Sequence, residues 1–270
     1  MNARIFSGGQ RVDAFAADDR GLAYGDGLFE TLRVHRGAAA WWDAHWGRLV
    51  AGAQRLALPL PDANLVRREA EALFADGGDG VLKLLVTRGA GARGYAPPRG
   101  AEPAWSLSRH PVPASAGALR LHWCATRLAI QPALAGIKHC NRLEQVLARA
   151  EADAAGADEG LVRDTEGAVV SATAANLFVL RGGRWVTPPM DRCGVAGVCR
   201  AHLLLLLEAQ ERRLAPDDVT GADAVFLCNA VRGILAVAGL GAHAWAPHPA
   251  VDAARRGLAS LHPAFATEIP

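Results

Sequence analysis

The sequence has 270 residues, 51% of them hydrophobic and 21% charged, and a formal net charge of +2 at pH 7. This composition is typical of a globular protein, and the absence of a basic excess argues against nucleic-acid binding. Because the five cysteines form no Cys-x-x-Cys pair and no apolar stretch has the length of a signal or a membrane span, we expect a cytoplasmic protein with reduced thiols and no membrane association.

The first part of the chain predicts an α+β domain over residues 1–109. Alternating or continuous apolar residues predict strands at 3–6, 11–14, 28–35 and 81–89. From Trp41 the apolar period changes to three and four, which predicts an amphipathic helix with Asp43 as its N-cap. A second helix is expected to begin near Asp62, and a glycine-rich loop follows the last strand.

Residues 110–117 contain two prolines and no periodic pattern, and we interpret them as a linker to a larger domain over residues 118–270. Strands are expected there at 119–124, 159–163, 176–180, 224–228 and 234–238. One expected helix has an apolar stripe formed by Leu143, Val146, Leu147, Ala150 and Ala154. Further helices are predicted through the leucine-rich segment 202–210, expected to be buried, and at 251–261.

Lysine is rare in this chain, because only Lys83 and Lys138 are lysines among 29 basic residues. Lys138 follows a loop of small residues and precedes a predicted helix, where the helix dipole disfavours a cation. An amine held there, partly desolvated, can act as a nucleophile or a base, which arginine cannot do. The alternative is a lysine that is simply solvated at the start of a helix.

Eight motifs occur in order between about residues 20 and 240. They are YGDGLFETLRV (24–34), HWGRL (45–49), TRGAGARGY (87–95), GIKHCNRLEQVLARAEA (136–152), ADEGLVRDTEG (157–167), AANLF (174–178), GVAGVCR (194–200) and LCNA (227–230). This series resembles the fold-type IV pyridoxal-phosphate enzymes, which have the D-amino-acid aminotransferase-like fold. Within that group the motifs are most similar to those of the bacterial 4-amino-4-deoxychorismate lyases.

The resemblance implies roles for particular residues. Lys138 would attach pyridoxal 5'-phosphate covalently and then act as the catalytic base on the substrate. Arg48, in the family's HxxRL pattern, would bind the cofactor phosphate, and a guanidinium suits that task because it donates two parallel hydrogen bonds. Other implied cofactor-binding residues are Ser171, Asn176, Val198, Cys199, Asn229 and Ala230. The backbone N–H groups of Val198 and Cys199 would meet the phosphate at a helix N-terminus.

Ser171 departs from the family pattern. A glutamate that pairs with the pyridine nitrogen normally stands five residues before Asn176, and this chain has a serine there. A hydroxyl can leave that nitrogen neutral and the ring a weaker electron sink. The change argues against an aminotransferase, unless Asp164 or Glu166 supplies the charge.

The implied activity is elimination of pyruvate from 4-amino-4-deoxychorismate to give 4-aminobenzoate for folate biosynthesis. The family also implies a homodimer with the active site between the two domains. The alternative within the same fold is a D-amino-acid or branched-chain aminotransferase, which shares the motif at residues 26–34. A relative that has lost cofactor binding is a third alternative, for which Ser171 is the only sequence support.

Lys83, Arg93 and Tyr95 are candidates for binding the substrate carboxylates, although Lys83 could equally be an outward-facing charge on a strand. His45 and His139 lie beside functional motifs and are interpreted as packing or capping residues. No pair of histidines has metal-ligand spacing with a third ligand, so no metal is expected.

Overall fold

The computed structural model describes residues 3–114 and 117–266. By their contacts, residues 1–112 and 137–141 form one compact unit (unit 1), and residues 113–136 and 142–270 form another (unit 2). The division therefore differs from the expected domains, because Lys138 and its neighbours belong to unit 1. The first unit boundary falls within the expected linker, 110–117, of which residues 115–116 lie outside the described part of the chain.

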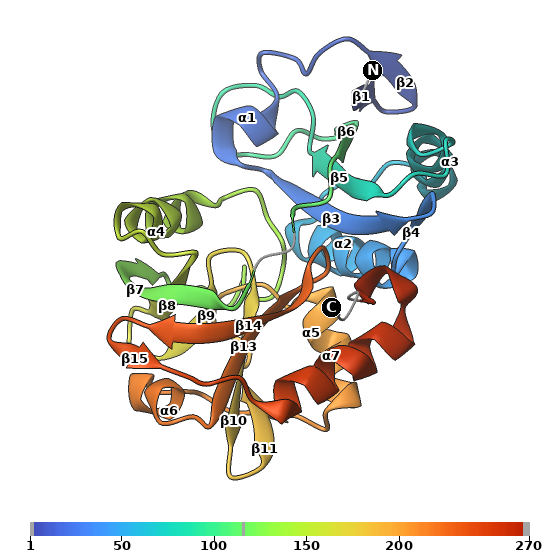
Figure 1. The fold of residues 1–270 in the computed structure, drawn as a ribbon. Helices are drawn as coiled ribbons and strands as arrows, with labels where there is room; N and C mark the ends of the chain where they lie inside the picture. Colours follow the sequence, from blue (N-terminus) through green and yellow to red (C-terminus); the bar gives the residue numbers. More distant parts are fainter. Residues whose placement is uncertain (1–2, 115–116, 267–270) are drawn as a thin grey trace. The chain divides into compact units, whose positions relative to one another are not determined.

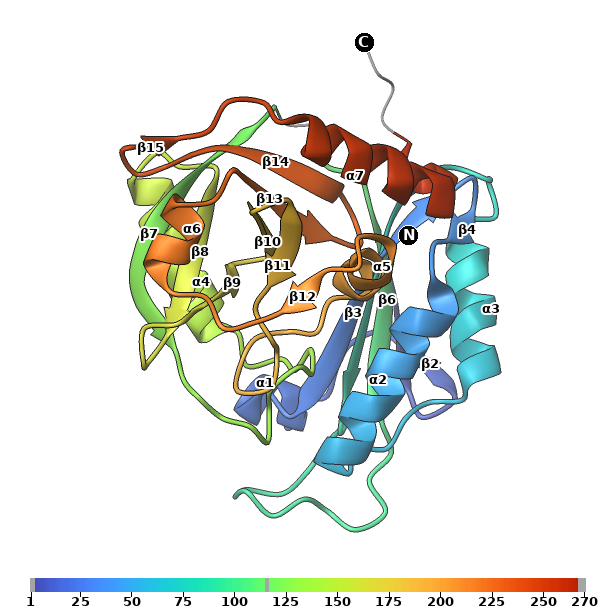
Figure 2. The same ribbon diagram turned by 90° about the horizontal axis from the view of Figure 1, so that it is seen from below.

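Unit 1 contains a six-stranded antiparallel sheet in the order β2-β1-β6-β5-β3-β4 (Figure 1). Its strands are β1 (Ala3–Ser7), β2 (Gln10–Val12), β3 (Gly27–His35), β4 (Ala38–Ala39), β5 (Gly80–Thr87) and β6 (Ala104–His110). Its helices are α1 (Arg20–Tyr24), α2 (Trp42–Leu56) and α3 (Ala63–Leu73). Helix α2 packs against β3 and α3 against β6, and Figure 2 shows these two helices along the sheet. Leu28, Leu32 and Val34 of β3 are consequently buried.

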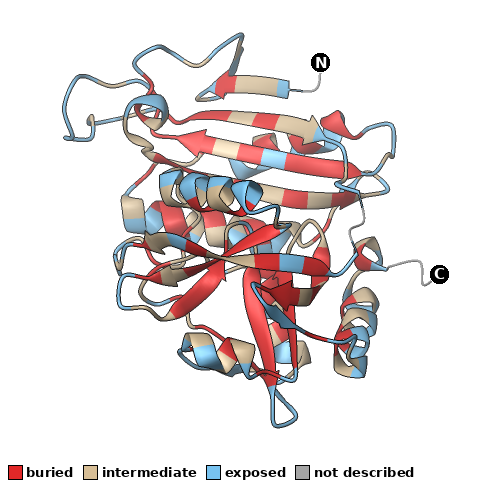
Figure 3. Cartoon of the chain, turned by 60° about the vertical axis from the view of Figure 1, so that its left-hand side comes forward, coloured by how far each residue is buried: buried red, intermediate tan, exposed pale blue. Residues whose placement is uncertain are grey.

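Unit 2 contains a nine-stranded mixed sheet, whose path is β12-β11-β10-β13-β14-β7-β8-β9 with β15 beside β14. The strands are β7 (Leu119–Leu128), β8 (Glu159–Asp164), β9 (Val169–Ala172), β10 (Asn176–Arg181), β11 (Arg184–Thr187), β12 (Gln210–Glu211), β13 (Ala224–Asn229), β14 (Gly233–Leu240) and β15 (His243–Ala244). The helices are α4 (Leu143–Ala154), α5 (Val198–Leu206), α6 (Pro216–Thr220), α7 (Pro249–Leu261) and the 3-10 turn η1 (Pro263–Phe265). Buried residues are concentrated in these strands (Figure 3).

Helix α4 faces the sheet with a different side from the one its sequence predicts. The buried residues are Ala148 and Ala152, which pack against β7 and β8. Leu143, Val146 and Leu147 of the predicted apolar stripe are instead exposed, as are Ala150 and Ala154. The apolar stripe is present on the helix, but it does not face the sheet. The small side chains of Ala148 and Ala152 let the helix approach the sheet more closely.

Two other helices differ in detail. Helix α2 has Trp41 rather than Asp43 as its N-cap, and Asp43 lies in its first turn. Helix α5 is only partly buried, because Leu205 is exposed on its surface while Leu203 is covered. The helix expected to begin near Asp62 is confirmed, since α3 starts at Ala63, and the side chain of Asp62 caps it by accepting the N–H of Leu65 at 2.7 Å. Within the described residues, no helix combines the length and apolar character that crossing a membrane requires.

Candidate functional site

The segment that carries Lys138 is fixed to the beginning of β3 in unit 1. The N–H of Phe29 donates to the carbonyl of Lys138 at 3.0 Å, and the N–H of Cys140 donates to the carbonyl of Gly27 at 2.9 Å. The Asn141 amide also donates to the carbonyl of Gly25 at 3.2 Å. Lys138 therefore lies in a segment that is hydrogen-bonded to the beginning of β3, and α4 begins only at Leu143. The dipole of α4 consequently has little effect on the Lys138 amine, in contrast to the expectation from the sequence.

Both lysines of the chain reach the ring of Phe29. The ammonium nitrogen of Lys138 is 4.3 Å from the ring centroid and that of Lys83 is 5.8 Å from it. Lys83 is exposed and pairs in register with Thr31 of β3. Lys83, Lys138 and Phe29 thus form one cluster within unit 1, on the side of β3 opposite to the buried Leu28.

On the helix-covered side of β3, Glu30 joins two residues of α2. One carboxylate oxygen of Glu30 accepts from His45 Nδ1 at 2.6 Å, and Arg48 donates to both oxygens, from Nε at 2.8 Å and from Nη2 at 2.5 Å. Glu30 and His45 are both 1% exposed, and the side chain of Arg48 is 14% exposed. The buried carboxylate of Glu30 therefore fixes the guanidinium group of Arg48, the predicted phosphate ligand.

The charges in this network follow from burial and hydrogen bonding. Burial alone would raise the pKa of Glu30, but the hydrogen bonds from His45 and Arg48 outweigh it and hold the pKa below its usual 4.5. Burial lowers the pKa of His45 below 6.5 despite Glu30, and the nearby charges of Arg48 and Lys138 lower it further. At pH 7 the network thus contains a carboxylate, a guanidinium and a neutral imidazole. The Nε2 atom of His45 is buried without a hydrogen-bond partner.

This role of Glu30 is not predicted from the sequence, which indicates only a packing or capping role for His45. A signal was present, because Glu30 is a carboxylate on the apolar side of a strand, between Leu28 and Leu32. A charged residue at such a position requires a buried partner. The HxxRL motif supplies two partners from one helix, since His45 and Arg48 are three residues apart.

The other two candidate substrate residues of unit 1 lie on the loop after β5. Arg93 and Tyr95 are exposed. The buried Arg20 holds this loop by donating to the carbonyl of Gly94 at 2.9 Å and to that of Tyr95 at 3.1 Å. The loop is therefore anchored through its backbone, which leaves the side chain of Tyr95 largely exposed.

In unit 2, Asn176 connects the start of β10 to the GVAGVCR segment. Its amide donates to the carbonyl of Val195 at 2.9 Å. A Cβ atom on Gly197 would lie 2.1 Å from Asn176 Oδ1, so only glycine permits this close approach. Gly197 is also the N-cap of α5, and no side chain caps that helix. The first N–H groups of α5, at Val198 and Cys199, are thus available in a way that suits a phosphate.

Asn229 shapes the turn after β13. Its side-chain oxygen accepts the N–H groups of Val231 at 3.0 Å and Arg232 at 2.8 Å, and its amide donates to the carbonyl of Ala174 at 3.2 Å. Asn176 pairs in register with Cys228, the residue before Asn229. The predicted residues Asn176, Asn229 and Ala230 therefore lie at one end of the paired strands β10 and β13.

Ser171 is buried in β9, and its hydroxyl donates to the carbonyl of Ala172 at 2.9 Å. The two carboxylates considered as substitutes for the missing glutamate have other partners. Asp164 accepts the N–H groups of Glu166 at 3.0 Å and Ala168 at 2.9 Å, and Glu166 forms an ion pair with Arg192. Because both carboxylates are held by these partners, neither Asp164 nor Glu166 is placed to replace the glutamate that the family has at position 171.

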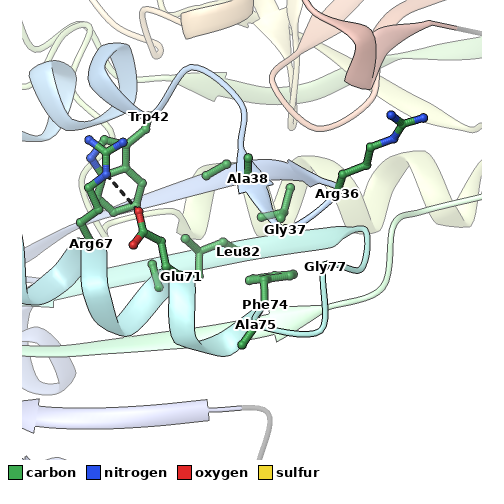
Figure 4. Close-up of a pocket in the computed structure, with 13 residues that line it drawn as sticks. Arg36, Gly37, Ala38, Trp42, Arg67, Glu71, Phe74, Ala75, Gly77 and Leu82 are labelled. Carbon is green, nitrogen blue, oxygen red and sulfur yellow. Dashed lines mark hydrogen bonds and ion pairs between the residues drawn. The ribbon is translucent and has the colours of Figure 1, made fainter.

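A cavity of about 390 Å³ lies elsewhere in unit 1, between α3, the start of α2 and the β3–β4 turn (Figure 4). An Arg67–Glu71 ion pair crosses its wall beside Trp42, and most other lining residues are small or apolar. None of the candidate site residues lines this cavity. Among the described residues, no group of three or more His, Cys, Asp or Glu could hold a metal ion.

Lys138 and Arg48 of unit 1, and the uncapped N-terminus of α5 in unit 2, are groups of the kind that enzymes use to hold phosphate-bearing cofactors. The sequence matches the family model for amino-transferase class IV over residues 27–240. The chain belongs to this family, and its fold is the fold-type IV aminotransferase fold.

Among its relatives, an aminodeoxychorismate lyase of Vibrio harveyi is 36% identical over 83% of this chain and 86% of that protein. The crystal structure of 4-amino-4-deoxychorismate lyase from Pseudomonas aeruginosa is 45% identical, with a TM-score of 0.88 over 95% of this chain and 98% of that one. A D-alanine aminotransferase of Bacillus licheniformis is 27% identical over 82% of this chain and 81% of that protein.

Proposed function

We propose that this protein is a pyridoxal-phosphate-dependent lyase that converts 4-amino-4-deoxychorismate to 4-aminobenzoate and pyruvate, a reaction that supplies folate biosynthesis. The observation that carries the proposal is Lys138, the amine fixed to β3 beside Phe29 in a chain 45% identical to a lyase of this name. Ser171 supports a lyase over an aminotransferase, because its hydroxyl is committed to the backbone and brings no carboxylate.

The residues present fit the cofactor. Lys138 would attach pyridoxal phosphate through its amine, and Arg48 would donate to the phosphate from a guanidinium already oriented by Glu30. The N-terminus of α5, which no side chain caps, would donate the N–H groups of Val198 and Cys199. The turn formed by Asn229 and Ala230 would contribute to the same phosphate. Ser171 and Asn176 would lie at the cofactor site without contributing a charge, because both side chains donate to backbone carbonyls.

When bound, the cofactor withdraws electrons from the carbon attached to the substrate nitrogen. In the proposed reaction, the amine of Lys138 accepts the proton from C4, the C3–O bond breaks, and enolpyruvate leaves as the ring becomes aromatic. The same amine can return that proton to the departing enolate, which gives pyruvate. Lys83 would bind a substrate carboxylate, since it reaches the same ring as Lys138, and Arg93 and Tyr95 are further proposed carboxylate ligands.

The test uses the only two lysines as a matched pair. The protein is incubated with pyridoxal phosphate, reduced with borohydride, digested and analysed by mass spectrometry, while pyruvate release is followed in a coupled assay. Lys138→Ala is expected to lose the covalent label and pyruvate release, whereas Lys83→Ala keeps the label. Normal turnover of Lys138→Ala, or a label on Lys83 alone, would overturn the proposal.

The alternative function is that of an aminotransferase for D-amino or branched-chain amino acids. It is supported by the relationship to the D-alanine aminotransferase. Incubation with D-alanine and 2-oxoglutarate distinguishes the two activities. Rapid formation of pyridoxamine phosphate, without pyruvate release from 4-amino-4-deoxychorismate, would favour the aminotransferase.

We further propose a homodimer, in which a second copy covers α4. Leu143, Val146 and Leu147 form an exposed apolar stripe at helical spacing and are 76%, 59% and 58% exposed. Such a stripe on a helix whose other side is already packed is typical of an interface. Sedimentation analysis should show a dimer that Leu147→Glu weakens and that Leu205→Glu, an exposed leucine on α5, leaves intact. A monomeric wild-type protein would exclude this arrangement.

A further inference from the structure

Two arginines lie side by side on neighbouring parallel strands of unit 2. Arg127 of β7 and Arg163 of β8 are partners in register, so their side chains leave the same face of the sheet. The Arg163 guanidinium carbon is 5.1 Å from the centroid of the Trp123 ring, which also belongs to β7. Both arginines are partly buried. Two positive charges therefore share one region of the sheet.

Neither charge is neutralised within the part of the chain that the structure describes. No ion pair or side-chain hydrogen bond involves Arg127 or Arg163 there, although the chain forms many arginine–carboxylate pairs. Arg127 Nη1 and Arg163 Nε are buried and have no hydrogen-bond partner. Buried N–H donors without partners are costly, so this arrangement requires an explanation.

The carboxylates on the adjoining elements have other partners. Glu151 of α4 accepts the backbone N–H groups of Ala125 and Thr126 in the irregular part of β7 that brings Arg127 into register. Asp164, at the end of β8, accepts two backbone N–H groups of the following turn. Glu159, at the start of β8, accepts from Thr173.

The positive charges of Arg127 and Arg163 consequently repel one another. Burial, together with the positive charge of Arg127, lowers the pKa of Arg163 below its usual value. Arg163 nevertheless keeps its positive charge, because arginine is effectively always protonated in proteins. An anion placed between them would remove the repulsion and satisfy the unpaired N–H groups.

We propose that Arg127 and Arg163 form a binding site for a small oxyanion, a carboxylate or a phosphate group. A guanidinium offers two parallel N–H groups that match the spacing of two oxygens in either anion. Because Trp123 covers one side of Arg163, the site favours a compact group over an extended polyanion. None of the residues of this site is among those proposed above to bind the cofactor.

The experiment uses full-length protein saturated with pyridoxal phosphate and then freed of excess cofactor, in a buffer without phosphate or carboxylate. Isothermal titration with inorganic phosphate and, separately, with benzoate is performed at constant ionic strength on the wild type, Arg127→Gln and Arg163→Gln. Arg184→Gln removes an exposed arginine from β11 and serves as the charge-matched control. Thermal unfolding of each protein without the anion is the second measurement.

We expect saturable binding of at least one anion, weakened tenfold or more in Arg127→Gln and Arg163→Gln and unchanged in Arg184→Gln. Binding of phosphate alone or of benzoate alone identifies the source of the oxyanion. Without the anion, Arg163→Gln should have a Tm equal to or above that of the wild type, because the repulsion is gone.

Three outcomes would overturn the proposal. One is the lack of saturable binding, and another is equal binding by all four proteins, which indicates a general salt effect. The third is a change in oligomeric state in Arg127→Gln or Arg163→Gln without a change in anion affinity, which indicates that a second copy neutralises the pair.

Discussion

Glu30→Gln tests the buried network that holds Arg48. The substitution preserves the shape of the side chain but removes its charge and replaces one acceptor oxygen with an NH₂ donor. That donor must then face either His45 Nδ1 or the N–H groups of Arg48, which now contact the carboxylate at 2.5–2.8 Å. The buried Glu30 cannot exchange these contacts for water, since it is 1% exposed.

The expected loss follows from breaking a buried charge pair, which costs about 3–5 kcal/mol. For a chain of this size each kcal/mol lowers Tm by about 2–4 °C, so a decrease of roughly 6–20 °C is expected. Circular dichroism of the protein without cofactor measures this effect independently of catalysis. The matched control is Glu71→Gln, whose ion pair with Arg67 is exposed and is worth at most about 0.5 kcal/mol.

The pH dependence provides a second check on Glu30. Because the folded pKa of Glu30 is below 4.5, its stabilisation is present above pH 4.5 and is lost as the pH falls through the lowered value. The Tm difference between the wild type and Glu30→Gln should therefore narrow in acid. A Tm shift no larger than that of Glu71→Gln, or a gap that widens in acid, would refute the reasoning.

Gly197→Ala places a methyl group 2.1 Å from Asn176 Oδ1 and should cost about 1–3 kcal/mol in urea unfolding, whereas Gly9→Ala, with no atom within 4 Å of the new methyl, should not. Equal stability of the two variants would contradict the close packing at α5. Arg20→Gln removes the anchor of the loop at Gly94 and Tyr95, so limited proteolysis of that loop should become about tenfold faster. An unchanged cleavage rate would show that other contacts hold the loop.

The elements that the sequence predicted best are those with a strong pattern. β3 and β5 were located to within two residues, because alternating and continuous apolar runs have few alternative structures. β6 and β9 were missed, since serines and small residues interrupt their apolar pattern. Their strand conformation depends on pairing with β5 and β8, which no local pattern records.

The sequence predicts a role for Lys138 because lysines are few and the proposed chemistry requires an amine. The structure places this residue beside Phe29, and its role stays a prediction. The contribution of Glu30 depends on which helix covers β3, which is tertiary information. The exposed apolar stripe on α4 could not be predicted either, because an apolar pattern does not reveal which side of a helix packs against the sheet.

The assignment of residues 137–141 to unit 1 has a consequence for folding. Gly27 and Phe29 obtain their hydrogen bonds from a segment roughly a hundred residues further along the chain, so these contacts close late and over a long loop. During synthesis, β5 can pair with one edge of the beginning of β3, but the other edge lacks its partner until Lys138 and Cys140 have emerged. A fragment that ends at residue 112 would lack residues 137–141, which pair with the beginning of β3. Neither unit can therefore be obtained by a single cut in the chain.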